Sequence, residues 1–123
     1  MPTPEQHLEQ ARANRVHAEY LLQHAPDDPT AMQWAVTAGF YCAVHCLQAY
    51  LVGQGLVPRS HVQRDNYLAN PRYGVPSGVY EAYKTLKRRS EGARYLLQRF
   101  RSEQVRAEVL DRDLTTVTAF VGL

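Results

Sequence analysis

A serine, a histidine and an arginine lie close together near the middle of the chain, at Ser60, His61 and Arg64. Serine is a good helix N-cap, so Ser60 is predicted to begin a short helix with His61 in its first turn. The free N–H groups and partial positive charge of that turn favour an anion such as phosphate, and Arg64 would add two donors one turn later. The alternative is a capped surface turn that binds nothing.

Three arginines on a later predicted helix differ in their surroundings. Arg88 points away from the apolar face of that helix, whereas Arg89 and Arg94 lie at its two edges, with Tyr83 and Ser90 near Arg94. A partly buried guanidinium needs a partner. Arg89 and Arg94 are therefore expected to meet a carboxylate, a carbonyl, a tyrosine or a bound anion, unless only their aliphatic stems cover apolar surface.

His45 lies between two cysteines, Cys42 and Cys46, on a predicted apolar helix. The histidine fits either a hydrogen-bonded core position or a polar site. A structural zinc site usually takes four ligands from more than one segment, and no second cysteine pair exists, so we expect no metal and no other cofactor. Cysteines four apart on one helix do not form a sensible disulfide, which favours reduced thiols and a cytoplasmic location.

The element that must position these residues is the stretch from Thr30 to Gly53, which has no charged residue and no internal proline. It predicts a helix of about 36 Å that is buried on most of its circumference. Its polar side chains fall in one stripe about 120° wide: Gln33, Thr37, Tyr41, His45 and Gln48. This stripe must face either a polar pocket or a partner.

Four further helices are predicted, over residues 4–25, 60–69, 79–100 and 102–121. Leu96, Leu97 and Phe100 are placed on the buried face of the third of these. The buried face of the fourth is predicted to hold Ala107, Leu110, Leu114, Val117 and Val121. Gly92, inside the third, indicates a close approach by another helix or a ligand. No segment alternates with period two for long enough to form a strand. We therefore predict an all-α fold, an up-and-down four-helix bundle with one additional short helix.

Length and charge set further limits on the function. The 123 residues predict a single domain, 1–123. Residues 59–106 carry eleven of the 14 lysines and arginines but four of the 12 acidic residues, which indicates either a footprint for a phosphate-bearing ligand or a solvated surface. The polar N-terminus and the polar residues within the apolar stretch argue against a signal peptide and a membrane span. Glycine-rich nucleotide loops and the His-Glu-x-x-His and Gly-x-Ser-x-Gly motifs are absent.

Three segments, in order, resemble HEPN domains (higher eukaryotes and prokaryotes nucleotide-binding). Residues 40–45 (FYCAVH), continuing to residues 48–51 (QAYL), resemble the second helix of that family. Residues 60–64 (SHVQR) are similar to its histidine-bearing segment, and residues 83–95 (YKTLKRRSEGARY) to its late signature. The resemblance covers about residues 5–120, which is nearly the whole chain.

The resemblance implies a bundle of four or five helices that dimerises. It implies either a metal-independent ribonuclease, often a toxin paired with a small nucleotidyltransferase, or a non-catalytic nucleotide-binding protein. Ribonucleases of the family carry an arginine followed four to six residues later by a histidine in the late helical region. Here Arg88 and Arg89 are followed by Arg94 and Tyr95 but by no histidine, which favours a binding role.

We therefore expect a homodimeric protein that binds nucleotide or RNA phosphate, as one half of a toxin–antitoxin or nucleotidyltransferase-associated pair. The polar cleft would be formed by His61, Arg64 and Arg94, with Ser60, His45, Tyr83, Ser90 and Arg89 around them. One alternative is a metal-independent endoribonuclease in which His61 is the general acid or base and Arg94 or Arg89 stabilises the pentacovalent phosphate. Another is a non-catalytic dimerisation module that uses the apolar central helix.

Overall fold

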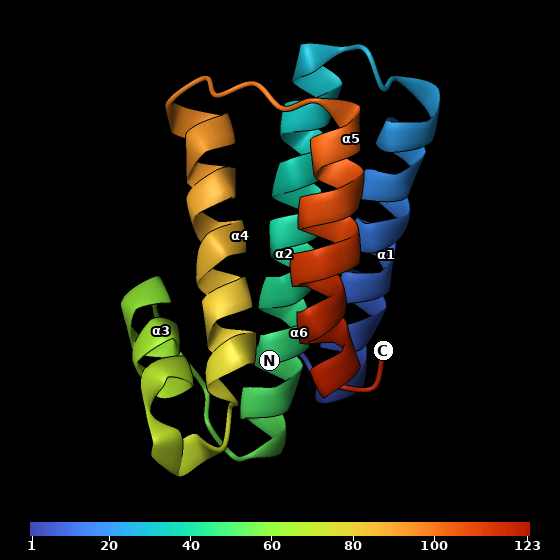
Figure 1. Ribbon diagram of the computed structural model, residues 1–123. Helices are drawn as coiled ribbons and strands as arrows, with labels where there is room; N and C mark the ends of the chain where they lie inside the picture. The colour runs from blue at the N-terminus through green and yellow to red at the C-terminus, as the bar shows by residue number, and fades with distance from the viewer.

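The computed structural model describes residues 1–123, which form helices and loops with no β-strand. The prediction of an all-α fold is confirmed. Side by side lie α1 (Pro4–His24), α2 (Pro29–Gly53), α4 (Ser77–Tyr95) and a C-terminal helix (Figure 1). The C-terminal helix runs without a break through α5 (Ser102–Gln104), a π-helical segment (Val105–Leu114) and α6 (Thr115–Phe120). The short α3 (His61–Ala69) lies outside α4, at the end of the molecule that also holds both termini (Figure 1).

The first three helices begin where the capping residues predict. Thr3 and Gln6 form a reciprocal capping box at the start of α1, followed by a proline at the first helical position. Asp28 accepts hydrogen bonds from two backbone N–H groups at the start of α2, and the Ser60 hydroxyl accepts one from Gln63 N (3.0 Å) at the start of α3. Side-chain chemistry therefore fixes these boundaries locally, before any packing.

The central helix α2 supplies much of the core. Of its 25 residues, 14 are buried. The helix is long and apolar enough to cross a membrane by composition, but 67% of its most apolar stretch is buried inside the fold, as in the core helix of a globular protein. The largest fully buried side chains come from α2, α3, α4 and the C-terminal helix: Met32, Leu47, Leu51, Leu68, Tyr83, Leu86, Leu110 and Leu114.

Gly39 allows the C-terminal helix to approach α2 closely. A β-carbon at this position would lie 3.3 Å from Val109 Cγ1 and 3.5 Å from Leu110 Cδ2. Any larger residue would therefore push the two helices apart, at a cost typical of overpacking.

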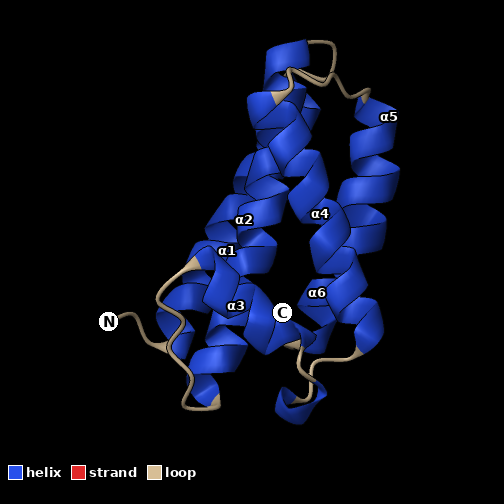
Figure 2. Cartoon of the chain, turned by 90° about the vertical axis from the view of Figure 1, so that its left-hand side faces the viewer, coloured by secondary structure: helices blue, strands red, loops and turns tan.

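The prediction of a helix over residues 79–100 is wrong at its C-terminal end, because α4 ends at Tyr95. Leu97 adopts φ +55°, and Leu96 and Leu97 are 78% and 77% exposed rather than buried. Residues 96–101 form an extended loop across the end of the molecule, anchored by the buried Phe100 (Figure 2). The close neighbour that Gly92 indicated is the Gln98 side chain of this loop.

The predicted buried face of the last helix is also only partly right. Leu110, Leu114 and Val117 are buried as predicted, but Ala107 is exposed, and Val105 and Val109 are buried instead. The reason is the π-helical segment, in which each residue advances by less than the about 100° of an α-helix. Residues spaced four and five apart then share a face, and Ala107 turns to solvent.

Candidate functional site

A cleft of about 210 Å³ opens between α2, α3 and α4, and we call it the α3–α4 cleft. It unites two of the segments that the sequence singles out, because His61 and Arg64 from α3 face Arg94 from α4 across it. The third predicted segment supplies its aromatic wall on α2. The lining residues are Phe40, Tyr41, His61, Arg64, Lys87, Glu91, Arg94 and Tyr95.

Arg64 is the most deeply buried cation of the cleft, with only 4% of its surface exposed. Its Nε donates a hydrogen bond to the Tyr83 hydroxyl (3.0 Å), and that hydroxyl donates to Asp65 Oδ1 (2.7 Å). Burial and the hydrogen bond to Asp65 raise the pKa of the Tyr83 phenol, so it stays protonated and available as a donor. This chain of bonds fixes the guanidinium plane and attaches α3 to α4.

Asp65 gives Arg64 only part of a counter-charge. It lies 3.8 Å from Arg64 Nε and forms a closer ion pair with Lys87, at 2.5 Å. One carboxylate thus serves two cations. The two terminal nitrogens of Arg64 have no hydrogen-bond partner in the chain. Neither is fully buried, because no fully buried side-chain nitrogen or oxygen lacks a partner, and Arg64 lines the cleft.

Arg94 is held on the opposite side of the cleft by neutral groups. Its Nε donates to the buried Ser90 hydroxyl (3.0 Å), and Nη1 donates to the hydroxyls of Tyr41 (3.2 Å) and Tyr95 (3.1 Å). The guanidinium also lies over the Tyr95 ring at 4.8 Å from its centroid, and over Tyr41 at 5.6 Å. No carboxylate lies within ion-pair distance, and Nη2 is free for a ligand.

His61 lies in the first turn of α3, exposed and lining the α3–α4 cleft. Ser60 itself is occupied by its capping bond and does not line the cleft. Tyr83 and Ser90 lie behind Arg64 and Arg94, where each positions the arginine in front of it. The sequence-predicted residues therefore divide into those that face the cleft and those that support them.

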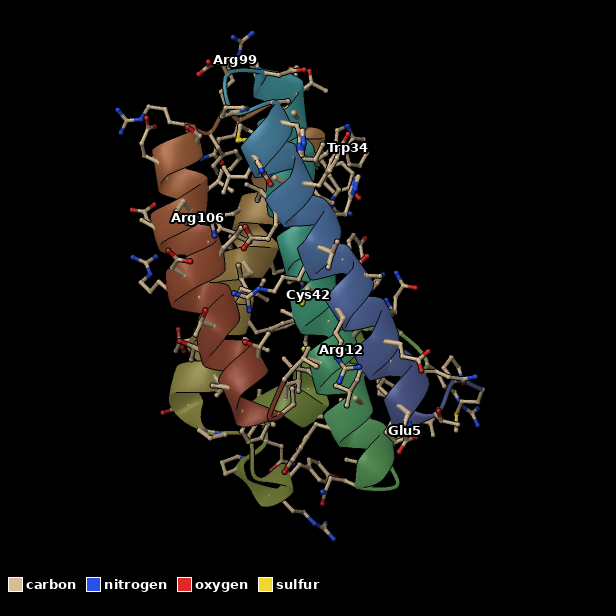
Figure 3. All side chains as sticks on the ribbon, turned by 90° about the vertical axis from the view of Figure 1, so that its right-hand side faces the viewer. Glu5, Arg12, Trp34, Cys42, Arg99 and Arg106 are labelled. Atoms are coloured by element: carbon tan, nitrogen blue, oxygen red, sulfur yellow. The ribbon has the colours of Figure 1, made fainter.

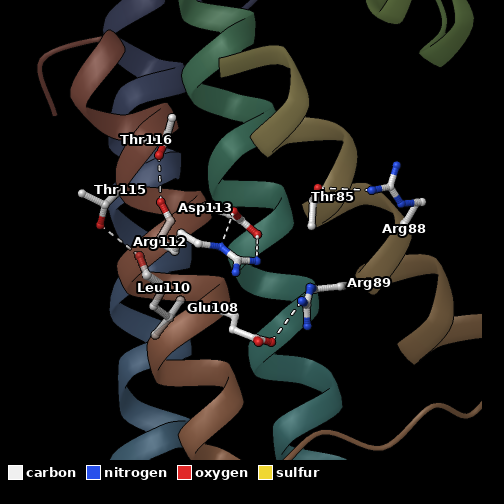
Figure 4. Close-up of polar contacts among 9 residues, drawn as sticks. All are labelled: Thr85, Arg88, Arg89, Glu108, Leu110, Arg112, Asp113, Thr115 and Thr116. Carbon is white, nitrogen blue, oxygen red and sulfur yellow. Dashed lines mark hydrogen bonds and ion pairs between the residues drawn. The ribbon is translucent and has the colours of Figure 1, made fainter. Parts of the chain in front are cut away.

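Arg89 lies away from the cleft. Its Nη2 forms an ion pair with Glu108 Oε2 (3.0 Å) that joins α4 to the C-terminal helix (Figure 4). The predicted partner of this arginine is thus a carboxylate of the chain. Arg88 donates to Thr85 on its own helix and stays exposed, as predicted (Figure 4).

His45 also lies outside the cleft, paired with a histidine that sequence reasoning missed. Its Nδ1 is 3.0 Å from Nδ1 of His7 on α1, so one imidazole donates a proton and the other accepts it. Burial lowers the pKa of both rings, and the charges of His7 and Arg64 lower that of His45 further. Nothing in the sequence near His7 marks it, because the contact depends on how α1 packs on α2.

Four residues of the polar stripe of α2, Gln33, Thr37, Tyr41 and His45, line an open groove between α1 and α4. Two hollows of about 330 Å³ each lie on either side of Trp34 along this groove and share Thr37. Gln10, Asn14 and His17 line the α1 side, and Ala93, Arg94 and Leu97 line the α4 side. Trp34 projects outward at its edge, whereas Cys42 lies inside, against α1 (Figure 3). The stripe therefore faces neither core nor sealed pocket in the single chain.

Larger hollows of about 470 and 480 Å³ lie at the opposite end, around the α1–α2 turn and the start of the C-terminal helix. Exposed arginines, Arg99 and Arg101, line one of them, but no buried polar side chain faces either hollow. The buried Arg64, with the hydrogen-bonded Arg94 opposite it, distinguishes the α3–α4 cleft from these larger spaces.

Lys87, Glu91 and Tyr95 are cleft residues that sequence reasoning missed. A signal for them was present, because Glu91 lies four residues after Lys87, three before Arg94 and four before Tyr95, spacings that place side chains next to each other on a helix. No protein family, curated protein or solved structure matches the chain.

Proposed function

We propose that this protein binds the phosphate group of a nucleotide or RNA in the α3–α4 cleft. The observation that carries the proposal is Arg64, a nearly fully buried cation that lines the cleft and whose terminal nitrogens have no hydrogen-bond partner in the chain. Burying a charge is costly unless it is paired, and Asp65 is shared with Lys87. A bound phosphate would complete the pairing through two parallel hydrogen bonds.

The other cleft residues support a phosphate that carries a base. Arg94 faces Arg64 with no carboxylate of its own, so two guanidinium groups would clamp one anion from α3 and α4. Tyr95 is 69% exposed at the mouth of the cleft, and an exposed aromatic ring stacks well on a nucleobase. His61 would add a further donor.

A matched pair of arginine variants tests the proposal. Fluorescence anisotropy would measure the binding of a labelled mixed-sequence RNA, with AMP as competitor. Arg94→Ala is expected to weaken binding at least tenfold, because it removes a charged donor from the cleft. Arg88→Ala removes the same charge from the solvent-facing side of the same helix and is expected to change binding less than twofold. Equal effects of the two variants would contradict a defined cleft.

A second candidate function is metal-independent endoribonuclease activity. It is favoured by one observation, that His61 and Arg94 line the same cleft although they lie on different helices. A base would take the proton of a ribose 2′-hydroxyl, the oxygen would attack phosphorus, and the 5′-oxygen would leave with a proton.

The test of this candidate is incubation with mixed-sequence RNA in EDTA. Cleavage that leaves 2′,3′-cyclic phosphate ends, and that is lost in both His61→Ala and Arg94→Ala, would establish the ribonuclease. The binding function predicts that the RNA stays intact at high protein concentration, and this is the result we expect from the missing histidine after Arg88 and Arg89.

The same proposal includes the assembly that the HEPN resemblance implies. The chain would be an up-and-down four-helix bundle of the HEPN type that forms a homodimer in the cytoplasm and pairs with a nucleotidyltransferase-type or antitoxin protein. Exposed Trp34, Leu96 and Leu97 beside the α2 groove support a protein interface. If the cleft binds no phosphate, this surface favours the alternative of a helical dimerisation module.

A further inference from the structure

The α3–α4 cleft contains a carboxylate that the binding of phosphate does not explain. Glu91 lines the cleft and forms neither an ion pair nor a side-chain hydrogen bond in the chain. The other carboxylate at this site, Asp65, is already engaged by Lys87 and by the Tyr83 hydroxyl. Glu91 is exposed and unpaired, so its carboxylate is available as an acceptor to a ligand in the cleft.

An ionised carboxylate can only accept hydrogen bonds. Beside a bound phosphate, Glu91 would repel the ligand and reduce its affinity. Glu91 lines the cleft together with Arg64, Lys87 and Arg94. A ligand that brings a hydrogen-bond donor to this side of the cleft, in addition to its phosphate, would offset this repulsion. Identifying that donor group would therefore identify which part of the ligand lies next to Glu91.

The size of the cleft indicates which donor is near enough. Its volume of about 210 Å³ equals roughly seven water molecules, which is room for a phosphate and its sugar. The base must then lie outside, against the exposed Tyr95, one helical turn beyond Glu91 on the same face of α4. The donors that reach Glu91 are therefore the ribose hydroxyls.

We propose that Glu91 accepts a hydrogen bond from a ribose hydroxyl of the bound nucleotide and makes the cleft selective for ribonucleotides over deoxyribonucleotides. The 2′-hydroxyl is the group by which proteins distinguish RNA from DNA. An acidic side chain that binds a ribose hydroxyl is also the solution used in dinucleotide-binding folds. This inference rests on the proposed phosphate-binding function and adds the sugar to it.

The experiment compares AMP, dAMP and inorganic phosphate by isothermal titration. The wild type is expected to bind AMP about tenfold more tightly than dAMP, the difference that one charge-assisted hydrogen bond makes. In Glu91→Ala the ratio should fall to about one. Phosphate and dAMP should bind about twofold more tightly to this variant, because a negative charge leaves the cleft. Glu81→Ala removes an exposed carboxylate that pairs with Lys84 elsewhere on α4 and should leave the ratio unchanged.

The outcomes separate the inference from the function on which it rests. Equal binding of AMP and dAMP to the wild type, or a tenfold ratio that survives in Glu91→Ala, would overturn the role of Glu91 while phosphate binding stands. A preference for GMP over AMP that is the same for the deoxynucleotides and is lost in Glu91→Ala would assign Glu91 to the base, and would also overturn it. Absence of binding by all three ligands would overturn the role of Glu91, and absence of RNA binding as well would overturn the proposed function.

Discussion

At the scale of single residues, Leu97 is the one non-glycine residue in the left-handed region of the backbone. This conformation costs a side-chain-bearing residue about 1–2 kcal/mol, and glycine adopts it freely. Strain of this kind concentrates at functional sites, and Leu97 lies on the wall of the α2 groove beside Trp34 and Arg94.

We expect Leu97→Gly to raise the free energy of unfolding by about 0.5–1 kcal/mol, because relief of strain exceeds the entropy that glycine adds to the unfolded chain. Urea denaturation measures the change. Leu96→Gly is the matched control, since Leu96 is equally exposed but has φ −110°, and it should give no gain. Equal effects at both positions would show that Leu97 is unstrained.

The His7–His45 contact makes stability depend on pH. Both rings have a pKa below the ordinary value of 6.5 in the folded protein, so the unfolded chain binds more protons as the solution is acidified. Their contribution is complete above pH 6.5 and is lost as the pH falls through the lowered folded values. The groups that face the pair are the rings themselves, from α1 and α2, and Arg64 from α3.

We therefore expect the wild type to lose up to about 1 kcal/mol more than His45→Gln between pH 7.5 and pH 5, a modest amount because water screens these half-buried rings. Urea denaturation at the two pH values measures the difference. His17→Gln, on the exposed side of α1, should behave as the wild type. A wild type and His45→Gln with the same pH dependence would contradict the shared-proton contact.

At the scale of elements, α3 is attached to α4 largely by polar groups. Tyr83 is the central residue of this attachment, because its hydroxyl accepts a hydrogen bond from Arg64 and donates one to Asp65. Tyr83→Phe removes both bonds and leaves a buried guanidinium with less of its pairing. We expect a loss of about 1–3 kcal/mol in the free energy of unfolding, together with weaker binding of phosphate.

Tyr80→Phe is the control for this change, since Tyr80 stacks near Tyr83 but its hydroxyl makes no hydrogen bond in the chain. Amide exchange in α3 should accelerate in Tyr83→Phe and not in Tyr80→Phe. If α3 kept its protection in both variants, apolar contacts such as that of the buried Leu68 would be sufficient to hold it.

The boundaries of these elements show what a sequence can predict. Prolines and capping residues such as Asp28 and Ser60 act within a few residues, so the starts of α1, α2 and α3 were predictable. The end of α4 was not, because Leu96 and Leu97 continue the apolar spacing and a left-handed leucine has no sequence signature. The buried face of the C-terminal helix was predicted with the wrong angular step, since its π-helical segment is not encoded in a recognisable pattern.

The candidate site was predictable in its residue types but not in its geometry. His61, Arg64 and Arg94 were identified from capping and helix faces, and they line one cleft. Arg89 and His45 were equally reasonable site candidates from their helix positions. Only the packing of helices distant in sequence shows that Arg89 pairs with Glu108 and His45 with His7. Partners that lie far away in sequence are set by tertiary structure.

At the scale of the whole molecule, the exposed apolar groups gather where the α2 groove meets the end of α4. Trp34 is 56% exposed between two hollows, and Leu97 lines one of them. We predict that the protein is a homodimer and that Trp34→Glu gives a folded monomer, because a charge at the centre of an apolar interface is strongly unfavourable.

Light scattering after size exclusion measures the mass, and circular dichroism confirms the fold. Val62→Glu, at an exposed apolar position on α3 away from the groove, should remain dimeric. A wild-type monomer would show that no dimer interface exists. A dimer that persists in Trp34→Glu would show that the interface lies elsewhere.

The way the C-terminal helix covers α2 has a consequence for synthesis of the chain. Gly39 and the apolar side chains around it are covered only when residues 105–117 have packed on them. A ribosome adds roughly 5–20 residues per second. The interval between synthesis of Gly53 and synthesis of Phe120 is therefore about 3–13 s, and the apolar surface of α2 stays uncovered for at least that time. During that interval the nascent chain exposes its most apolar segment, and we expect chaperones that act on the nascent chain to bind this helix.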